Sequence, residues 1–246
     1  MSHIKRHVIP GGWGISRKAK VYTVAPTPGP HKKSECIPLL IIVRDLLSYA
    51  HTGSEAKKII NRGIISVDGV VRKEYNYPAG FMDTISIGGT SEHFRLVLAD
   101  NGLKLEKIDE ASAGRKPCII KSRHTTKGGI ECITLHDGRV MQLGKGKSDY
   151  RPGDTVIVEF GRHEAKAKGK TPSRTCKIAG HFRVEKGAGV MIINGKNRGV
   201  RGKVKDVRDR KFMTEKSIVI VESEGREIET IKAYVMATGH EKEGRK

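Results

Sequence analysis

The spacing of hydrophobic residues between positions 38 and 63 predicts two short helices. Apolar residues of the first helix recur on one helical face, namely Leu39, Val43, Leu46, Leu47 and Ala50. Pro38 has a fixed φ that suits the first position of this helix. Gly53 then interrupts the pattern, and Ser54 is the predicted N-cap of the second helix, which Gly63 is expected to end.

The second predicted helix has two chemically different faces. Its apolar positions share the side that is expected to be buried, namely Ala56, Ile59 and Ile60. Its outward face carries three cations, Lys57, Lys58 and Arg62. A basic surface on rigid elements binds phosphate groups without any catalytic residue. The alternative is that these cations only form a solvated helix face.

Alternating residues and turn signals predict strands through most of the remaining chain. The dipeptide Asp68-Gly69 is typical of a type I′ hairpin turn between residues 64–67 and 70–71. Further strands are expected at residues 94–98, 103–105, 118–120, 130–135, 140–143 and 155–158. Short strands at this spacing favour a compact β domain. Its Lys and Arg residues are scattered, so we expect it to give structural support.

A hydrophobic run at residues 190–193 is followed by Asn194-Gly195 and a basic, glycine-rich loop. Gly199 and Gly202 alternate there with the cations Lys196, Arg198, Arg201, Lys203 and Lys205. The glycines are expected to permit positive φ and a close approach of backbone N–H groups to phosphate. The alternative is an ordinary turn on a solvated barrel. Strands at residues 217–221 and 226–231 follow.

The first 36 residues look irregular, with several prolines around a Gly-Gly-Trp-Gly turn. Seven cations face the single acid Glu35 there, namely Lys5, Arg6, Arg17, Lys18, Lys20, Lys32 and Lys33. Because this segment has too few apolar residues for a core, we expect an arm that becomes ordered on RNA. The alternative is a disordered tail. Trp13 either stacks on a base or caps the next domain.

The composition adds evidence about the partner of the protein, its location and its cysteines. Among 246 residues, 47 Lys and Arg exceed 27 Asp and Glu, and the formal charge of +20 indicates a polyanionic partner. The longest apolar run, residues 36–43, is too short to span a bilayer, and we expect a cytoplasmic protein. The cysteines lack the spacing of a zinc site and are expected to be reduced thiols: Cys36, Cys118, Cys132 and Cys176.

Some short segments resemble parts of catalytic motifs, but each of these motifs is incomplete. Gly146-Lys147-Ser148 and Gly169-Lys170-Thr171 resemble the end of a P-loop, but the required earlier glycine is replaced by Met141 and Glu164. His163-Glu164 lacks the second histidine of a zincin helix. We therefore expect no enzyme activity, no cofactor and no metal site.

Two segments of the chain resemble signature segments of one protein family. They are Gly29–Leu39 and Tyr77–Asp83, and both are similar to the archaeal and eukaryotic type of small-subunit ribosomal protein four. The start His3-Ile4-Lys5-Arg6 and the single Trp13 fit the same family. Residues 38–87 resemble its αL RNA-binding module, and residues 187–205 resemble a KOW motif.

The resemblance implies an α+β, mostly β fold with four parts. They are a basic arm at 1–36, an αL-type module at 37–91, a central β domain with a basic linker at 92–175, and a KOW-bearing SH3-like domain with a charged tail at 176–246. The linker, residues 161–174, is either an RNA-contacting loop or a plain connection.

The implied function is that of a structural constituent of the small ribosomal subunit, which binds and stabilises folded rRNA and supports translation. The expected partners are small-subunit rRNA, in its 5′ part, and neighbouring ribosomal proteins. The alternative is a non-ribosomal or transcription-associated RNA-binding factor. The predicted RNA contacts are Lys5, Arg6, Arg17, Lys18, Lys32, Lys33, Arg44, Lys57, Lys58, Arg62, Lys196, Asn197, Arg198, Arg201 and Lys203.

Overall fold

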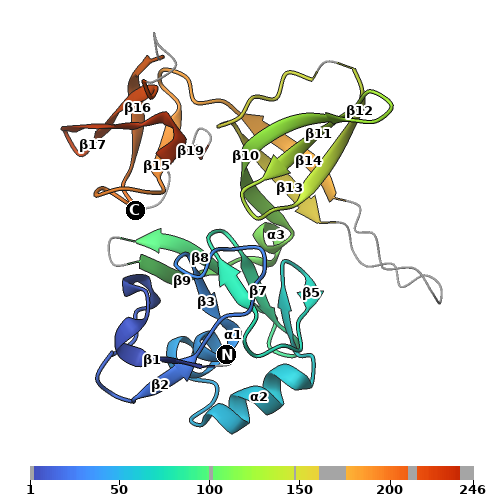
Figure 1. Ribbon diagram of the computed structural model, residues 1–246, viewed down its shortest axis with the longest axis vertical. Helices are drawn as coiled ribbons and strands as arrows, with labels where there is room; N and C mark the ends of the chain where they lie inside the picture. The colour runs from blue at the N-terminus through green and yellow to red at the C-terminus, as the bar shows by residue number, and fades with distance from the viewer. Residues whose placement is uncertain (1–2, 100–101, 147, 161–175, 210–214, 239–246) are drawn as a thin grey trace. The chain divides into compact units, whose positions relative to one another are not determined.

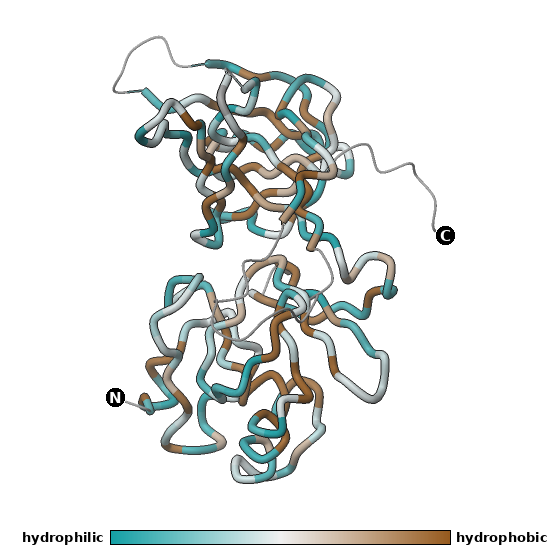
Figure 2. Tube along the Cα trace, turned by 90° about the vertical axis from the view of Figure 1, so that its right-hand side faces the viewer, coloured by the Kyte–Doolittle hydropathy of each residue, from teal (hydrophilic) through white to brown (hydrophobic). Residues whose placement is uncertain are grey.

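The structure is a computed structural model that describes residues 3–99, 102–146, 148–160, 176–209 and 215–238 (Figure 1). It divides into two compact units. Unit 1 comprises Met1–Lys116 with Glu159–Thr175, and unit 2 comprises Pro117–Val158 with Cys176–Lys246. Strands outnumber helices in the described part, which confirms the α+β, mostly β class. Hydrophobic and hydrophilic stretches alternate along the traced chain (Figure 2).

The first helical segment of unit 1 is shorter and more irregular than the pattern predicted. Helix α1, Leu39–Ile41, continues as a π-helix, η3, over Ile42–Leu46. Pro38 precedes the helix as its N-cap and is the last residue of strand β3, Cys36–Pro38. The reason is long-range pairing, because β3 is extended against β6, Pro78–Gly80. The apolar stripe itself is confirmed as buried from Leu39 to Val43.

The second helix, α2, spans Gly53–Asn61, and its predicted N-cap is wrong. Thr52 caps it instead, because its Oγ1 accepts a hydrogen bond from the Glu55 N–H at 3.2 Å. Glu55 completes a capping box, because its carboxylate accepts a hydrogen bond from the Thr52 backbone N–H. The hydrogen bonds that this carboxylate accepts from the backbone N–H groups of Thr52 and His51 hold the pKa of Glu55 below the ordinary value. Gly63, with φ +75°, follows the C-cap and ends the helix as predicted.

Unit 1 also contains a five-stranded antiparallel sheet of order β5-β4-β7-β8-β9. Its strands are β4 Ile65–Val67, β5 Val70–Val71, β7 Thr84–Ile87, β8 Glu92–Ala99 and β9 Gly102–Ile108. Asp68 and Gly69 both have positive φ, which confirms the predicted type I′ turn between β4 and β5. The predicted domain boundary after residue 91 falls between two paired strands of this sheet. A single turn of helix, α3, follows at Glu110–Ala113.

The N-terminal segment is folded, so the expectation of an irregular arm is wrong for residues 3–24. Strands β1, His3–Lys5, and β2, Tyr22–Val24, pair with each other, and the short 3-10 turns η1, Arg6–Val8, and η2, Gly11–Trp13, lie between them. Trp13 is only 1% exposed and therefore packs within the protein. Of the two roles considered for it, the packing role holds.

Unit 2 contains two further five-stranded sheets. The first has the order β12-β11-β10-β13-β14. Its strands are β10 Arg115–Thr126, β11 Ile130–Leu135, β12 Val140–Lys145, β13 Thr155–Phe160 and β14 Cys176–Phe182. All were predicted except β14. The basic linker, 161–174, and the charged tail, 239–246, lie outside the described residues.

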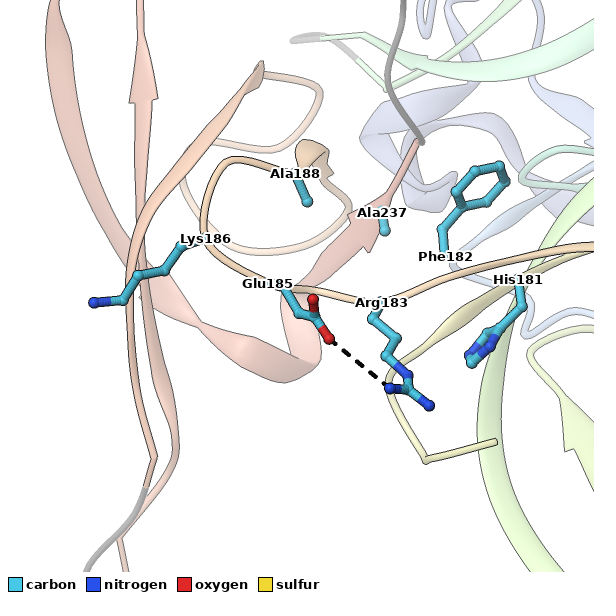
Figure 3. Close-up of a pocket in the computed structure, with 7 residues that line it drawn as sticks. All are labelled: His181, Phe182, Arg183, Glu185, Lys186, Ala188 and Ala237. Atoms are coloured by element: carbon cyan, nitrogen blue, oxygen red, sulfur yellow. Dashed lines mark ion pairs between the residues drawn. The ribbon is translucent and has the colours of Figure 1, made fainter. Parts of the chain in front are cut away.

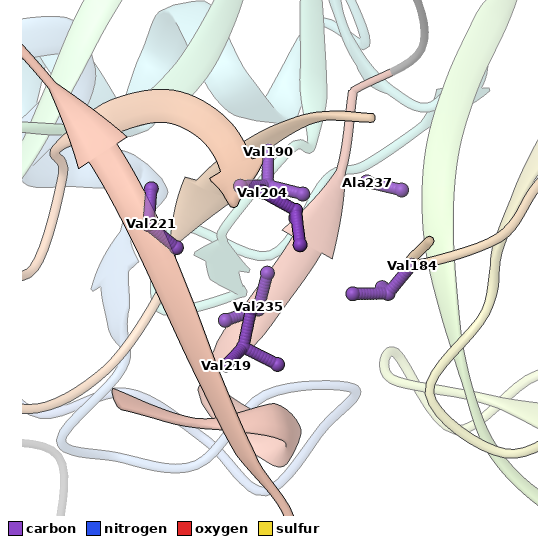
Figure 4. Packing of buried hydrophobic residues seen from close by; sticks show 7 residues of the cluster. All are labelled: Val184, Val190, Val204, Val219, Val221, Val235 and Ala237. Atoms are coloured by element: carbon purple, nitrogen blue, oxygen red, sulfur yellow. The ribbon is translucent and has the colours of Figure 1, made fainter. Parts of the chain in front are cut away.

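The second sheet of unit 2 has the order β18-β17-β16-β15-β19. Its strands are β15 Gly189–Ile192, β16 Arg201–Arg208, β17 Ile218–Ser223, β18 Arg226–Ile231 and β19 Val235–Ala237, with the 3-10 turn η4 at Lys232–Tyr234. Six valines and Ala237 form its core (Figure 4). Gly202 allows the tight packing of β16 on β17, because a Cβ there would lie 2.3 Å from the Glu222 carbonyl oxygen.

Candidate nucleic-acid interface

Helix α2 presents the cationic face that the sequence predicted. Ala56 and Ile60 are fully buried on one side of the helix. Lys57, Lys58 and Arg62 are exposed on the other side. The capping box and the buried side fix the helix, so the three cations project from a rigid element. Such a surface can neutralise several neighbouring phosphates of a folded RNA at once.

The segment after β5 extends this basic face and was missed in the sequence. Lys73 lies beside Gly63 at the end of α2. A Cβ atom built on Gly63 would lie 3.4 Å from the Lys73 Cε atom. Lys57 lies over the Tyr75 ring, with Nζ 4.3 Å from the ring centroid. Arg72 lies over the Tyr77 ring in the same way, at 4.5 Å. The adjacent pair Arg72-Lys73 was the available sequence signal.

Arg44 differs from the other predicted contacts near α2. Its side chain is 13% exposed, and its Nη2 atom forms an ion pair with Asp45 at 2.7 Å. It lies beside the start of α2, since a Cβ on Gly53 would be 3.6 Å from Arg44 Nη1. The carboxylate of Asp45 offsets much of the guanidinium charge, so Arg44 offers less to a phosphate than the cations of α2 do.

The predicted contacts of the N-terminal arm separate into exposed and buried residues. Lys5, Arg17, Lys18, Lys32 and Lys33 are exposed. Arg6 is only 4% exposed, and its Nε donates a hydrogen bond to the Ser16 carbonyl oxygen at 2.5 Å. We therefore correct the expectation for Arg6, whose side chain stabilises the fold between β1 and β2 and is not available on the surface.

The loop between β15 and β16 and the first residues of β16 carry the second group of predicted contacts. Lys196, Asn197, Arg201 and Lys203 are exposed, and Arg198 is half-buried. Two glycines of this loop have positive φ, Gly195 at +91° and Gly199 at +92°. That part of the expectation is confirmed, whereas Gly202 serves strand packing. The loop therefore combines two backbone positions that favour glycine with a high density of cations.

A buried charge network in unit 1 was not anticipated. The Lys116 ammonium group is fully buried and donates to Asp68 at 2.9 Å and to Asp83. His31 Nε2 lies 3.0 Å from an oxygen of Asp83. The backbone N–H groups of Gly80 and Thr84 donate to the two carboxylates at 2.9 and 3.0 Å. The network thus joins the N-terminal segment, the β4–β5 turn, the β6–β7 region and β10.

Electrostatics explain how two buried carboxylates are tolerated. Burial by itself would raise the pKa of Asp83, but the Lys116 ammonium and the hydrogen bond from His31 hold that pKa well below its usual range. Nearby Cys36 has its pKa raised to about 12 by burial and by the Asp83 charge. The Cys36 thiol is therefore protonated at neutral pH and poorly nucleophilic.

The described residues also form a pocket in unit 2, but no metal site. Within the described ranges, no group of three His, Cys, Asp or Glu residues is placed to hold a metal ion. A pocket of about 360 Å³ in unit 2 is lined by His181, Arg183 and Lys186 (Figure 3). Each of these side chains already faces a carboxylate of this chain, Asp154, Asp149 and Asp206 respectively. In the described part of the chain, no helix is both long and apolar enough to cross a membrane.

Family models match three successive parts of the chain. The RS4NT (NUC023) domain matches residues 2–34, the S4 domain matches residues 39–85, and the Ribosomal family S4e model matches residues 90–165. The S4 match contains α1, η3, α2 and the β4–β5 hairpin, and thus the cationic face of α2. These matches define the class as a ribosomal protein with an S4 domain.

Full-length relatives then identify the family. The small ribosomal subunit protein eS4 of Methanococcus maripaludis is 37% identical over 97% of this chain and 94% of its own length. The protein of the same name from Methanocella arvoryzae is 36% identical over 97% of this chain and 94% of its own length. The crystal structure of the 30S ribosomal protein S4e from Thermoplasma acidophilum matches with a TM-score of 0.66 and 25% identity, covering 83% of this chain and 95% of that one. The chain belongs to the ribosomal S4e family, which is not an enzyme class.

Proposed function

We propose that this protein is a structural constituent of the small ribosomal subunit that binds and stabilises folded small-subunit rRNA and so supports translation. The observation that carries the proposal is the rigid cationic face of α2 inside the S4 match. The full-length similarity to proteins named as small-subunit constituents gives that face its context. The chemistry that this face supports is the binding of phosphate groups.

The mechanism rests on charge and rigidity. Lys and Arg side chains displace the counterions that surround folded rRNA, and they favour its shape more than its sequence. Several modest contacts on one chain reinforce each other through their effective concentration. The contacts that we propose are Lys5, Arg17, Lys18, Lys32, Lys33, Arg44, Lys57, Lys58, Arg62, Arg72, Lys73, Lys196, Asn197, Arg198, Arg201 and Lys203.

The setting of this function also belongs to the proposal. We place the protein in cytoplasmic ribosomes, in contact with the 5′ part of the small-subunit rRNA and with neighbouring ribosomal proteins. Support comes from the basic composition and from the archaeal relatives. Crosslinking in native cells tests it directly: crosslinks concentrated in a few small-subunit rRNA helices are expected. Crosslinks spread over mRNA or tRNA would instead favour a non-ribosomal RNA-binding factor.

Charge reversal on α2 tests the proposed interface. Replacing Lys57, Lys58 and Arg62 by Glu should prevent incorporation into small subunits, because like charges would then face the phosphates. The readout is the amount of tagged protein that co-sediments with small subunits in a sucrose gradient. A control with Glu at three exposed lysines outside the contact set should incorporate normally: Lys104, Lys121 and Lys216. Normal incorporation of the α2 variant would contradict the role of this face.

A further inference from the structure

A shallow groove of about 400 Å³ lies on the outward side of the unit 1 sheet, just beyond the end of α2. Its volume is within the range of sites that hold small organic groups. Strands β4, β5, β7 and β8 each contribute to its lining, and Gly63, Glu110 and the turn between β7 and β8 also line it. The groove has not been given a role by the proposed α2 contacts.

Strand register explains why polar side chains gather in this groove. Ser66 pairs with Ser86, and Ser86 pairs with His93, so these residues form a row across three adjacent strands. Directly paired residues project from the same face of a sheet. The alternate residues Ile65 and Ile85 are 1% exposed and face the core. The row is therefore an outward-facing set, and it has no part in the core.

The groove has the chemistry of a polar site with an apolar border. The His93 Nδ1 and Ser86 Oγ atoms lie 2.8 Å apart, which fixes the imidazole relative to the hydroxyl. Ser66 Oγ donates to the Ser86 carbonyl oxygen over a long 3.4 Å. Val71 borders the groove and is 52% exposed, so it provides an accessible apolar surface there. The lining contains hydroxyls, an imidazole and one carboxylate, from Glu110, but no Lys or Arg.

Cations lie at the edge of the groove. Gly63 belongs both to its lining and to the end of α2, directly after the exposed Arg62. The same glycine is next to Lys73, as the 3.4 Å separation from a Cβ on Gly63 shows. Phosphates that approach this edge would meet two positive side chains, whereas a group inside the groove would meet hydroxyls, an imidazole and the Glu110 carboxylate.

We infer that this groove binds the base and ribose of one unpaired ribonucleotide, while the flanking phosphates contact Arg62 and Lys73. This inference rests on the proposed RNA-binding function and adds a site for a single nucleoside to it. A base can lie against Val71 with its edge toward Glu110, and the serine hydroxyls of the row can bond the ribose 2′-OH. Proteins distinguish RNA from DNA through that 2′-OH, so the groove favours RNA.

The test compares RNA with DNA on the full-length protein. Fluorescence anisotropy measures the affinities for a labelled ten-nucleotide oligo(A) ribonucleotide and for its deoxyribonucleotide counterpart at one fixed salt concentration. The double variant with Ser66→Ala and Ser86→Ala should bind the RNA about fivefold more weakly, as expected for loss of about one net hydrogen bond. Its affinity for the DNA should not change. The His124→Ala variant, an exposed histidine on β10, is the matched control and should bind both probes normally.

Charge variants separate failure of this inference from failure of the proposed function. Replacing Lys58 and Arg62 by Gln should weaken RNA and DNA binding together, because both probes carry phosphates. If the serine variant keeps its RNA preference while the charge variant loses affinity, the groove is not a nucleoside site and the RNA-binding function stands. If neither set of changes lowers RNA affinity, the proposed function fails as well.

Photocrosslinking gives a second measurement that needs no substitution in the groove. Irradiation of the wild-type protein with the same oligo(A) ribonucleotide, followed by mass spectrometry of the peptides, should place a linked nucleotide between residues 86 and 93. Crosslinks confined to α2 and other segments would overturn the inference, even if the serine variant did not fold.

Discussion

Removal of the buried Lys116 ammonium group tests whether the unit 1 charge network stabilises the fold. The Lys116→Met substitution keeps a side chain of similar length and deletes the cation between Asp68 and Asp83. Both carboxylates are at most 2% exposed, so they cannot recover solvation from water. Breaking a buried ion pair by removing one partner typically costs about 3–5 kcal/mol. His31 remains beside Asp83, which favours the lower end of that range.

The pH dependence of this loss follows from the pKa of Asp83. In the wild-type protein that pKa lies below its ordinary 3.8, so the contribution to stability is complete at neutral pH and is lost as the pH falls below about 4. In the variant, burial is no longer offset by Lys116, and the pKa of Asp83 should rise above 3.8. Protonation then relieves the buried charge, so the stability difference between the two proteins should shrink from pH 7 to pH 4.5.

Native-state hydrogen exchange is the suitable assay, because it reports the two units separately. Amides of residues 78–87 in unit 1 should exchange about a hundredfold faster in the variant at pH 7, since each 1.4 kcal/mol corresponds to a factor of ten. Amides of β16 and β17 in unit 2 provide the internal control and should be unaffected. Less than a threefold change at residues 78–87, or a difference independent of pH, would refute the argument.

Two further predictions concern α2. The Thr52→Ala variant should lose about 1 kcal/mol of helix stability, seen as faster exchange of the α2 amides, whereas Ser54→Ala should have little effect because Ser54 is not the cap. Equal losses in both variants would contradict the capping assignment. Replacing Lys57, Lys58 and Arg62 by Gln should reduce the dependence of log affinity on log salt by roughly 2–3 for purified small-subunit rRNA, and an unchanged slope would show that these cations do not contact phosphate.

The sequence was sufficient for features that depend on neighbouring residues. The hydrophobic period, the Asp68-Gly69 turn and the helix-ending Gly63 are local signals, and the structure confirms each of them. The errors at Pro38 and Ser54 have different causes. Pro38 is held extended by pairing with Pro78, which lies 40 positions later and leaves no local trace. Thr52 was overlooked although its capping partner Glu55 stands three residues later, which was a readable signal.

The site was predictable only in its exposed part. Cations on a helix face can be predicted from the residue types and from the helical spacing of the apolar residues. The cationic face of α2 lies where it was predicted. The buried network could not be read in this way, because Lys116 lies 48 and 33 positions from its two carboxylate partners. Arg6 shows the opposite error, since a positive charge in a basic segment gives no sign that the side chain is buried.

The two signature segments pack against each other within unit 1. Gly29–Leu39 contains His31 and strand β3, and Tyr77–Asp83 contains strand β6 and Asp83. The segments pair through β3 and β6 and meet again where His31 contacts Asp83. Gly80 packs against the His31 ring so closely that a Cβ would lie 2.3 Å from it. The exposed Lys32 and Lys33 are thus presented by a segment that the core holds in place.

The same reasoning predicts that docking of the N-terminal segment strengthens RNA binding. Gly12 and Gly102 cross so closely that a Cβ on Gly102 would lie 2.1 Å from the Gly12 Cα atom. The Gly102→Ala substitution should therefore displace the η2 turn, and its own φ of +123° adds strain. Trp13, the only tryptophan, lies in that turn and should show a red-shifted fluorescence when it becomes exposed.

A displaced arm keeps every cation but must be ordered again when it binds. Fixing even one backbone residue costs about 1–2 kcal/mol, so affinity for small-subunit rRNA should fall about tenfold or more at constant charge. Gly128→Ala is the matched control, because its φ of +95° imposes similar strain without any atom within 4 Å of the new Cβ. If Trp13 fluorescence shifts in the Gly102→Ala variant while the rRNA affinity stays at the wild-type value, the folded state of the arm does not increase the affinity for rRNA. Its exposed cations would then bind equally well from a flexible chain.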